Sequence, residues 1–349
     1  MGKTLIYSQD LGSVNWIIPI LRKIAKHDFL MIAHNLSYSR MFEQFSDTKK
    51  LDHYFPDQNV QISDWQGFIQ KENIKRVFCS TSSRYKDLSN SNLIIASRLE
   101  GIKTLSIMDH WKGYDRFFSL NNESYMSDEI LCIDSNSKKR LKDIGFPEKA
   151  IHIVGHPGLE FITENSHINN TFSNCLRILI ISQVFFDGEK LRSLFINSRG
   201  ESRLLRDIIL TSRKVVKKNY SLFYRPHPKE DPPKKILENI ILDNSEHWKY
   251  SLQKHDIFIG YNSMALIEAQ LSGKICICLD YKEFDGSDDN HLPFKFPITV
   301  DNHEALAREL ESIDNNFKEY KRYPIYQDFE KFSGSIDKAS QVVVNFLKD

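Results

Sequence analysis

Short apolar runs alternate with longer amphipathic runs along the whole chain, and this alternation is the feature that most restricts the fold. Thr4–Tyr7 and Phe29–Ala33 have the length and composition of buried parallel strands. Between them, apolar residues recur at helical spacing over Val14–Ile24. Strands that alternate with helices form parallel sheets covered by helices. The sequence therefore predicts an α/β fold built on parallel sheets.

The pattern continues through both halves of the chain. Further strands are predicted at Arg76–Ser80, Lys103–Met108, Glu129–Asp134, Ile151–Val154, Leu176–Ile181, Ser221–Tyr224, Asp256–Gly260, Lys274–Leu279 and Pro297–Val300. Further helices are predicted at Ser202–Lys218, Ser263–Leu271, Asn302–Ile313 and Ile336–Leu347. We therefore expect two Rossmann-like domains that face each other across a cleft.

Length and local composition suggest where the domains lie. At roughly 150 residues per domain, a chain of this length predicts two domains. The polar stretch Thr163–Asn174 has no apolar periodicity and is predicted as the linker. We expect residues 1–162 to form the first domain and residues 172–333 the second. Residues 334–349 would form a helix that crosses back to the first.

Charge and hydropathy exclude several classes of protein. The chain carries 47 Lys and Arg against 46 Asp and Glu, a net charge of +1, which argues against a nucleic-acid binder. No apolar run approaches the roughly 20 residues of a membrane-spanning helix. Five cysteines without zinc-site spacing favour a reducing compartment. We expect a cytoplasmic protein, and a peripheral contact with the inner face of the cytoplasmic membrane is compatible with this sequence.

The segment Tyr224–Glu230, of sequence Tyr-Arg-Pro-His-Pro-Lys-Glu, directly follows a predicted strand. The carboxyl ends of parallel strands are where such sheets bind ligands. Prolines on both sides of His227, including Pro228, stiffen the backbone there. Two interpretations stay open. In the first, Arg225 and His227 bind an anion, or His227 binds it while Arg225 forms an internal ion pair. In the second, the segment is a stiff surface loop.

A second segment, Asn262-Ser263-Met264, follows the next predicted strand, Asp256–Gly260. Ser263 is placed to cap the following helix, whose free N–H groups form a phosphate site. Glu268 lies more than one turn into that helix, where it could accept hydrogen bonds from a ribose. The alternative is an ordinary capped helix with a solvated or Lys-paired Glu268.

Taken together, the two segments resemble the donor site of GT-B glycosyltransferases of bacterial polysaccharide assembly. Sialyl- and Kdo-type transferases have a similar His-Pro motif and a later Ser motif that hold the nucleotide. Teichoic-acid polymerases have a similar Arg-Pro-His-Pro followed by paired serines, where this chain has a single Ser263. The resemblance covers mainly residues 150–280. It implies a GT-B fold and binding of a nucleotide-sugar donor by Arg225, His227, Pro228, the 262–264 segment and Glu268.

The same order of motifs also resembles non-hydrolysing UDP-N-acetylglucosamine 2-epimerases, which share this fold. Their Gly-Asn-Pro turn is similar to Gly155-His156-Pro157. Their Ser-Gly-Gly before a Glu-bearing helix is replaced here by Asn262-Ser263-Met264. That difference favours the transferase interpretation over the epimerase one.

The first half offers two clusters at predicted strand ends. Asp10, Gly12 and Ser13 lie in a turn into a helix, and Asp10 is a candidate base or helix-terminal charge. The second cluster, after Met108, has a density of polar and aromatic groups that suits a sugar. Its members are Asp109, His110, Trp111, Tyr114 and Arg116.

These clusters predict catalytic and sugar-binding roles. Asp109 or His110, in preference to Asp10, would take a proton from an acceptor hydroxyl. Trp111 and Tyr114 would stack on sugar rings, with Gly12, Ser13 and Arg116 as further contacts. The alternative is that Asp109 and His110 only form local hydrogen bonds within the turn and that Trp111 lies in the core. Gln183, after the first strand of the second half, is a further candidate for donor contact.

The chain contains no Asp-x-Asp triplet and no His, Cys or carboxylate group with metal spacing. We therefore expect no metal and no cofactor, with leaving-group charge stabilised by protein groups.

The leading hypothesis is a GT-B glycosyltransferase that moves a sugar to a glycan or lipid-linked glycan acceptor. A CMP-activated acidic sugar is slightly favoured over a UDP-sugar. The alternatives are a UDP-sugar 2-epimerase or hydrolase and a non-catalytic nucleotide-sugar-binding partner.

Overall fold

The chain divides into two compact units in the computed structural model. Unit 1 comprises Met1–Phe161 and Lys331–Asp349, and unit 2 comprises Ile162–Glu330. The structure describes residues 2–24, 28–56, 59–82, 87–118, 124–165, 175–187, 190–193, 203–228, 230, 240–261, 263–281, 296–320 and 332–348. Each unit is treated by itself below.

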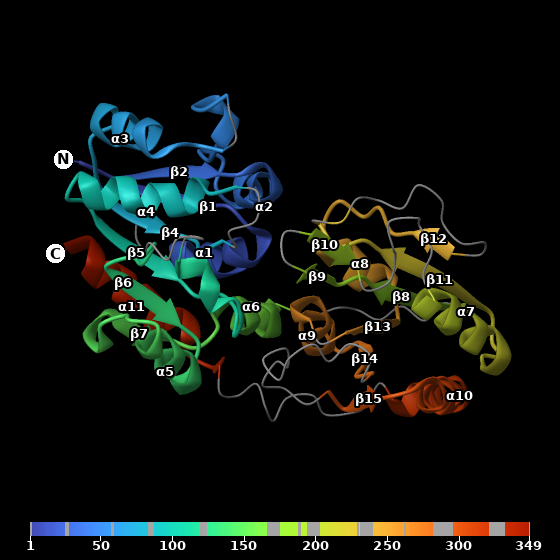
Figure 1. Ribbon diagram of the computed structural model, residues 1–349. Coiled ribbons are helices and arrows are strands. Elements are labelled where there is room, and N and C mark those ends of the chain that lie inside the picture. The colour runs from blue at the N-terminus through green and yellow to red at the C-terminus, as the bar shows by residue number, and fades with distance from the viewer. Residues whose placement is uncertain are drawn as a thin grey trace. The chain divides into compact units, whose positions relative to one another are not determined.

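Unit 1 is a parallel sheet in the order β3-β2-β1-β4-β5-β6-β7 (Figure 1). Its strands are β1 (Lys3–Ser8), β2 (Phe29–Ala33), β3 (Lys49–Lys50), β4 (Ile74–Cys79), β5 (Lys103–Ile107), β6 (Glu129–Cys132) and β7 (Ile151–Ile153). Its helices are α1 (Leu11–Lys23), α2 (Asn35–Gln44), α3 (Ile62–Lys71), α4 (Ser89–Leu99), α5 (Ser135–Asp143), α11 (Ser335–Lys348) and the first part of α6 (Pro157–Asn165), whose last residues are assigned to unit 2. Short 3-10 turns are η1 (Leu51–His53), η2 (Tyr114–Phe117) and η3 (Glu148–Ala150).

The strand order of unit 1 reverses direction between β1 and β4. The chain moves outward from β1 to β2, then returns to β4 and moves the other way to β5. Because such crossovers are right-handed, α1 and α4 cover opposite faces of the sheet. The carboxyl ends of β1 and β4 therefore flank the topological switch point, which is where open α/β sheets bind ligands.

Unit 2 contains a second parallel sheet, in the order β12-β11-β8-β13-β14-β15. Its strands are β8 (Leu176–Ile181), β11 (Tyr220–Arg225), β12 (Ile240–Leu242), β13 (Ile257–Tyr261), β14 (Ile275–Leu279) and β15 (Ile298–Val300). A separate antiparallel pair is formed by β9 (Val184–Asp187) and β10 (Lys190–Ser193). The helices are α7 (Arg203–Val215), α8 (Trp248–Lys254), α9 (Met264–Leu271) and α10 (His303–Tyr320). The switch point of this sheet lies between β8 and β13.

The predicted α/β class is confirmed. β2 and β8 have the predicted bounds, and the other predicted strands differ from the observed ones by one or two residues at their ends. The predicted linker is wrong at its start, because α6 runs to Asn165 with Pro157 in its first turn. The rest of the predicted linker lies outside the described residues.

Helix α11 packs against α1 within unit 1. Lys23 and Asp337 form an ion pair of 2.8 Å, and the hydroxyl of Ser340 lies 3.5 Å from the carbonyl of Ile20. At the start of α11, the carboxylate of Glu160 accepts the amide N–H groups of Gly334 and Ile336. These contacts bind the last helix of the chain to α1 and α6.

An aromatic cluster supports the start of α6 in unit 1. The ring of His156 stacks on Trp111, with centroids 5.7 Å apart, and accepts a hydrogen bond from Trp16 Nε1 at 3.1 Å. Just before it, Gly155 has a φ of +87°, and an added Cβ there would lie 2.0 Å from the hydroxyl oxygen of Ser335. The segment therefore needs glycine for both its conformation and its close approach to α11.

Candidate functional site

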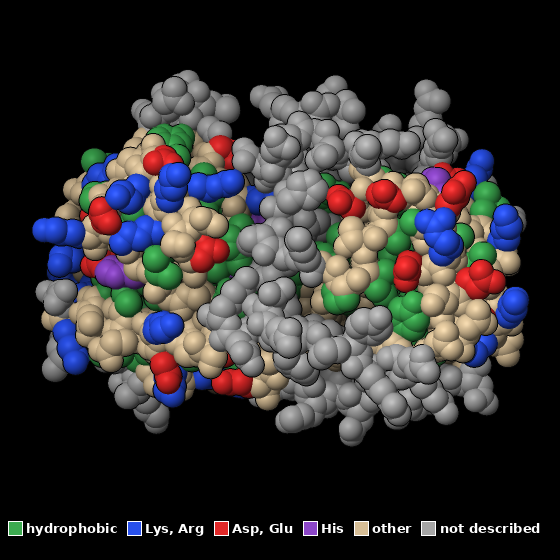
Figure 2. All heavy atoms as spheres, turned by 90° about the horizontal axis from the view of Figure 1, so that it is seen from below, with side chains coloured by type: hydrophobic (Ala, Val, Ile, Leu, Met, Phe, Trp, Pro, Cys, Tyr) green, Lys and Arg blue, Asp and Glu red, His purple; other side chains and the backbone are tan. Residues whose placement is uncertain are grey.

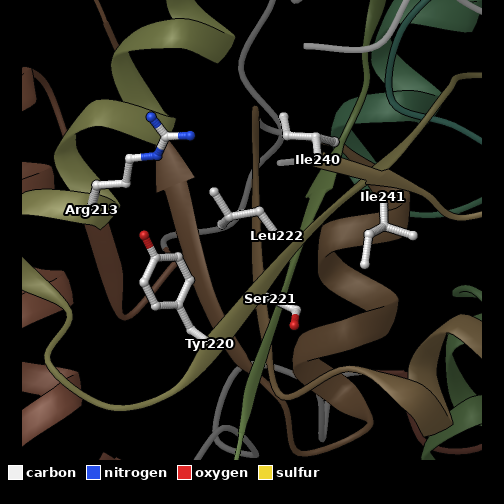
Figure 3. Close-up of a pocket in the computed structure, with 6 residues that line it drawn as sticks. All are labelled: Arg213, Tyr220, Ser221, Leu222, Ile240 and Ile241. Atoms are coloured by element: carbon white, nitrogen blue, oxygen red, sulfur yellow. The ribbon is translucent and has the colours of Figure 1, made fainter. Parts of the chain in front are cut away.

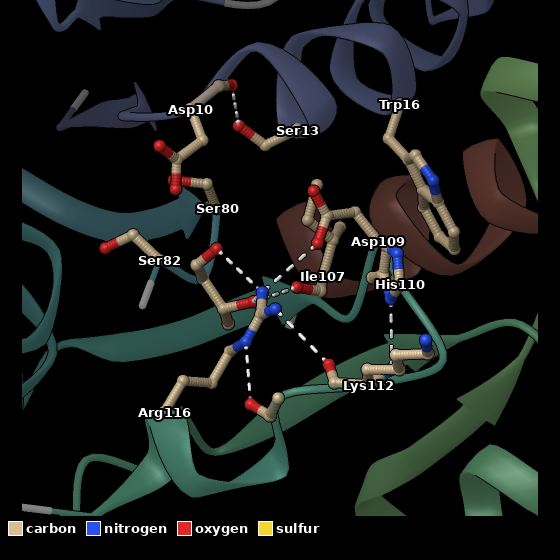
Figure 4. A network of polar contacts seen from close by, with 12 residues as sticks. Asp10, Ser13, Trp16, Ser80, Ser82, Ile107, Asp109, His110, Lys112 and Arg116 are labelled. Carbon is tan, nitrogen blue, oxygen red and sulfur yellow. Dashed lines mark hydrogen bonds and ion pairs between the residues drawn. The ribbon is translucent and has the colours of Figure 1, made fainter. Parts of the chain in front are cut away.

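The carboxyl edge of the unit 1 sheet carries a dense polar network (Figure 4). Asp10 begins α1 after β1, Ser80 follows β4 and accepts the amide of Gln9, and Asp109 follows β5. The network therefore spans the switch point between β1 and β4 and the neighbouring strand.

The central pair of this network is Asp109 and Arg116. Arg116 Nη1 donates to Asp109 Oδ1 at 3.2 Å, and to the carbonyl and hydroxyl of Thr81 at 3.2 and 3.1 Å. Its Nε donates to the carbonyl of Gly113, and its Nη2 to that of Lys112. The guanidinium is thus held by two loops and fixes one oxygen of the Asp109 carboxylate. The predicted sugar contact of Arg116 remains a prediction, but most of its donors already have partners in the protein.

The second oxygen of Asp109 lies over the first turn of α1. An added Cβ on Gly12 would be 2.6 Å from Asp109 Oδ2, so glycine leaves room for this carboxylate. Burial raises the pKa of Asp109, the Arg116 guanidinium opposes the rise, and the nearby Asp10 carboxylate adds to it. A carboxyl group with a raised pKa and one fixed oxygen suits general acid–base work.

His110 is better suited to donate a hydrogen bond than to accept a proton. Burial, aided by the Arg116 and Lys112 cations, lowers the pKa of His110 to about 3, so the ring is neutral near pH 7. Its Nδ1 accepts the amide N–H of Lys112 at 3.1 Å, which places the proton of the neutral ring on Nε2. The prediction that His110 is a base is therefore corrected to that of a hydrogen-bond donor.

Two predicted sugar contacts are wrong because their side chains belong to the core of unit 1. Trp111 is 6% exposed, stacks on His156, and donates from Nε1 to Asp134 Oδ2 at 2.7 Å. Ser13 is fully buried, and its hydroxyl donates to the carbonyl of Asp10 at 2.6 Å. Neither side chain presents a face or a hydroxyl to a ligand.

The remaining predicted residues of this edge are partly exposed. Asp10 is the N-cap residue of α1, but its side chain makes no capping hydrogen bond. Tyr114 packs against the small core around Phe117, with the guanidinium of Arg140 5.6 Å from its ring centre. Gly12 is exposed. The predicted roles of Asp10, Gly12 and Tyr114 remain predictions.

Sequence reasoning missed an imidazole–carboxylate pair at the same edge. His34 follows β2, and its Nε2 lies 3.0 Å from Asp87 Oδ2. Asp87 also accepts the amide of Ser89 at 2.8 Å, and its carbonyl accepts from the side chain of Gln9. Inspecting the residue after every predicted strand, including Phe29–Ala33, would have found His34.

In unit 2, three strands bring the predicted donor residues to one sheet edge. Ile181 of β8 pairs with Arg225 of β11 on one side and with Gly260 of β13 on the other. With strands about 4.8 Å apart, Arg225 and Gly260 are separated by roughly 10 Å at this level. The segments that carry His227, Gln183 and Ser263 all leave the sheet from this edge.

Arg225 itself is an internal ion-pair partner, as one interpretation of the sequence had it. Its Nη1 donates to Asp243 Oδ2 at 3.0 Å, to the carbonyl of Ser245 at 3.0 Å and to the hydroxyl of Ser251 at 2.9 Å. Asp243 is 7% exposed; burial opposes its ionisation, but hydrogen bonds from Ser245 and Ser251 and the charge of Arg225 lower its pKa to about 2. This network joins the ends of β11 and β12 to α8, and a further role of Arg225 toward a ligand remains a prediction.

The turn after β11 is held by a carboxylate that the sequence did not single out. Glu230 accepts the backbone N–H of His227 at 3.0 Å and the hydroxyl of Tyr224 at 2.9 Å, and donates its own N–H to the carbonyl of His227. The ring of His227 is half-buried and Pro228 is exposed. The position of His227 is thus fixed by its backbone as well as by its prolines.

The Ser263 cap is confirmed. Its hydroxyl accepts the amide of Leu266 at 3.3 Å at the start of α9, where Met264 is half-buried. Glu268 is 7% exposed, on the buried second turn of α9. Gln183 is half-buried after β8, and the adjoining Ser182 N–H donates to the carbonyl of Arg225. Asn262 lies outside the described residues.

A pocket of about 570 Å³ opens elsewhere on unit 2 (Figure 3). It is lined by Arg213, Tyr220, Ser221, Leu222, Ile240 and Ile241. These residues include the first positions of β11 and β12, so the pocket lies at the amino edge of the sheet, opposite the predicted donor residues.

Charge on the surface is mixed in sign. Lys and Arg side chains are interspersed with Asp and Glu over the visible face of the described residues (Figure 2). Within the described part of the chain, no three His, Cys, Asp or Glu side chains gather as metal ligands. Among the described helices, none is both long and apolar enough to cross a membrane.

Comparison with solved structures identifies the architecture. UDP-GlcNAc 2-epimerase from Neisseria meningitidis, bound to UDP-GlcNAc, superposes with a TM-score of 0.62 at 14% identity, covering 99% of this chain and 100% of that one. The chain has the GT-B fold. The UDP-GlcNAc 2-epimerase of Methanocaldococcus jannaschii, in complex with UDP-GlcNAc and UDP, gives 0.58 at 16% identity, covering 99% of both chains.

A glycosyltransferase shares the GT-B fold as well. The glycotransferase of kitacinnamycin superposes with a TM-score of 0.56 at 10% identity, covering 98% of both chains. No protein-family model matches the chain, and no curated protein is similar to it in sequence. The identities with these structures are low, so the likeness establishes the fold alone.

Proposed function

We propose that this chain is an enzyme that acts on a nucleotide-activated sugar, with epimerisation or hydrolysis of a UDP-N-acetylglucosamine-like substrate as the first candidate reaction. The observation that carries the proposal is the switch point of unit 2. There the Ser263-capped end of α9 and the segment of Gln183 leave adjacent strands, and the His227 turn leaves the next strand. Free N–H groups at a helix start bind phosphate.

Within the proposal, unit 2 binds the nucleotide. The first-turn amides of α9 and the ring of His227 would hydrogen-bond the phosphates, and Glu268 would accept from the ribose. Asp109 of unit 1 would act as acid or base, because burial raises its pKa above that of an ordinary aspartate and Arg116 fixes one of its oxygens. Protein donors would then stabilise the charge of the departing nucleotide.

The choice of epimerisation rests on relatives of the same fold. The Neisseria and Methanocaldococcus structures are named as UDP-GlcNAc 2-epimerases and hold UDP-GlcNAc. Both extend over nearly the whole of this chain. This supports the epimerase hypothesis more strongly than the transferase hypothesis that the sequence motifs favoured.

Glycosyl transfer is the second candidate reaction, and two observations support it. The kitacinnamycin glycotransferase shares the fold, and Asn262-Ser263-Met264 stands where the epimerase resemblance expects Ser-Gly-Gly. In that case the donor would be a CMP-activated acidic sugar or a UDP-sugar. The acceptor would be a glycan or lipid-linked glycan of bacterial surface polysaccharide assembly.

Isotope exchange without an acceptor separates the two reactions. Inversion at C2 of the sugar breaks and re-forms the C2–H bond, so incubation with UDP-N-acetylglucosamine in D₂O should place deuterium at C2. Proton NMR would show loss of the C2 proton signal and the appearance of a C2 epimer or free sugar. Substrate that remains unlabelled and intact without an acceptor, but is consumed with one, would favour the transferase. Binding without turnover in either condition would favour a non-catalytic partner.

Substitution of His227 tests the nucleotide site itself. We expect His227→Ala to weaken UDP binding about tenfold or more, the loss of one hydrogen bond to a charged group. His247→Ala is a matched control, because His247 is also a partly buried histidine of unit 2, at the start of α8. Equal affinity of wild type and His227→Ala in calorimetry would remove His227 from the site.

A further inference from the structure

The unit 2 sheet has a step in its edge where the pocket of Figure 3 opens. β12 begins at Ile240, which pairs with Leu222 of β11. The two residues of β11 before Leu222, Tyr220 and Ser221, pair with β8 on their other side. On the β12 side, no residue of the described part of the chain pairs with them. The pocket of about 570 Å³ lies at this step.

The backbone of Tyr220 faces the step. In a parallel strand, the N–H and C=O groups of one residue point to the same neighbouring strand, and successive residues alternate between the two neighbours. The carbonyl of Tyr224 accepts from Asp243 at the end of β12, and that of Arg225 accepts from Ser182 at the end of β8. Counting back in steps of two from Tyr224, the N–H of Tyr220 is directed to the β12 side, where the pocket opens.

Arg213 brings a positive charge to the pocket from the last turn of α7. Figure 3 shows its guanidinium group and the hydroxyl of Tyr220 on the same side of the pocket. Burial raises the pKa of Tyr220 and the charge of Arg213 opposes the rise, so the hydroxyl keeps its proton at neutral pH. The guanidinium, the hydroxyl and the Tyr220 N–H are all donors, and none of the six lining residues is acidic. Such a set of donors suits the oxygens of a carboxylate or a phosphate.

The other side of the pocket is aliphatic. Figure 3 shows Ile240 and Ile241 across from Arg213, with Leu222 between the two sides. Leu222 and Ile240 are buried at 3% and 8% exposure, whereas Ile241 is 51% exposed. An alkyl group that lies over these side chains would remove apolar surface from water, which is favourable.

The pocket thus combines one cationic, hydrogen-bonding side with one aliphatic side. Its volume is within the roughly 300–1,000 Å³ of small-molecule sites, which are lined mainly by apolar side chains with a few polar groups. A ligand that matches both sides has a single anionic head and an apolar body.

We propose that this pocket binds an amphiphilic anion, with a carboxylate or phosphate head held by Arg213 and Tyr220 and an alkyl body over Leu222, Ile240 and Ile241. The site goes beyond the proposed function, because it lies at the amino edge of the sheet. The six residues of β11 separate it by roughly 17 Å from the carboxyl edge that carries the proposed nucleotide residues. Its test therefore does not depend on whether the chain binds nucleotides.

Calorimetry with octanoate and octyl phosphate, below their micelle-forming concentrations, tests the site. Both should bind saturably at one site per chain. Octan-1-ol, which has the chain without the charge, and inorganic phosphate, which has the charge without the chain, should each bind at least about tenfold more weakly. No binding of octanoate or octyl phosphate, or equal affinity for octan-1-ol, overturns the proposal.

Substitutions on the two sides locate the site. Arg213→Gln should weaken the binding of both anions about tenfold, the loss of a charge-assisted hydrogen bond. Lys214→Gln is the matched control, because Lys214 is the next residue of the same helix turn, is also exposed, and does not line the pocket. Ile241→Ser should weaken octyl phosphate several-fold and leave inorganic phosphate unchanged. An unchanged affinity in Arg213→Gln, or an equal loss in Lys214→Gln, overturns the proposal.

The natural source of such an anion is a free amphiphile or the lipid of a membrane. Exposed Lys214, Lys217 and Lys218 follow Arg213 along the chain, and basic residues favour an anionic lipid surface. Sedimentation with phosphatidylcholine vesicles, with and without phosphatidylglycerol, separates the two sources. Binding to phosphatidylglycerol vesicles that octyl phosphate and Ile241→Ser both reduce assigns the anion to a membrane lipid. Binding of octyl phosphate without binding of vesicles assigns it to a free amphiphile, and the anion site stands in both cases.

Discussion

Replacing Asp109 with Asn should slow turnover of UDP-N-acetylglucosamine by about 10²–10⁴-fold, the usual contribution of general acid–base catalysis. The amide is nearly the same size as the carboxyl group and can still accept from Arg116, so the network of unit 1 should persist. What is lost is the group that exchanges a proton. Steady-state kinetics should show the loss in kcat, with KM within a few-fold of wild type.

The control for this variant is Asp115→Asn, an exposed carboxylate on η2 of the same loop. It should leave kcat unchanged. The raised pKa of Asp109 adds a second readout, since the wild-type pH–rate profile should have a limb above the ordinary aspartate range that Asp109→Asn lacks. Full activity of Asp109→Asn would exclude Asp109 from the chemistry.

Replacing Asp243 with Ala should destabilise the fold by about 3 kcal/mol, near the lower end of the cost of breaking a buried ion pair. The substitution removes the carboxylate that pairs with Arg225 and accepts from the hydroxyl of Ser251. The lower end applies because the Arg225 side chain is 21% exposed and keeps some contact with water. Urea unfolding monitored by circular dichroism measures the change. Glu246→Ala, at a carboxylate 78% exposed, is the control and should have little effect. A change below 1 kcal/mol for Asp243→Ala would contradict the importance of this network.

The same pair sets a pH dependence. The pKa of Asp243 is about 2 in the folded chain, below its value in the unfolded chain. Its contribution to the free energy of unfolding is therefore fully present above about pH 4. It is lost as pH falls from there through the folded pKa. The wild type should therefore lose about 2 kcal/mol from this residue over that interval, and Asp243→Ala should lack that part of the acid sensitivity.

Strands were easier to predict than helices in this chain. β2 is a continuous apolar run between Asp28 and His34, and β8 is an apolar run interrupted only by Arg177, so both are visible in the sequence. Helix α5, of sequence Ser-Asn-Ser-Lys-Lys-Arg-Leu-Lys-Asp, buries only Ser137 and Leu141 and has almost no apolar period. It is stabilised by the Asp134 cap and by packing, and a search for apolar spacing does not detect it.

The candidate site was predictable in its position but less so in its chemistry. Parallel strands of a sheet bring their carboxyl ends to one edge, which is why the strand-end positions of Asp109 in unit 1 and of His227 and Ser263 in unit 2 could be predicted from the sequence. Whether a polar side chain faces a ligand depends on contacts between distant segments. Trp111 is turned into the core by Asp134 and His156, from other elements, so its role could not be read from its own loop.

The measurement that tests the account most directly is calorimetric titration of the wild-type chain with UDP and UDP-N-acetylglucosamine, beside His227→Ala. The account predicts saturable binding of both ligands at one site per chain, weakened by the substitution. Absence of binding by the folded wild-type chain, for these ligands and for the cytidine and guanosine nucleotides alike, would contradict it.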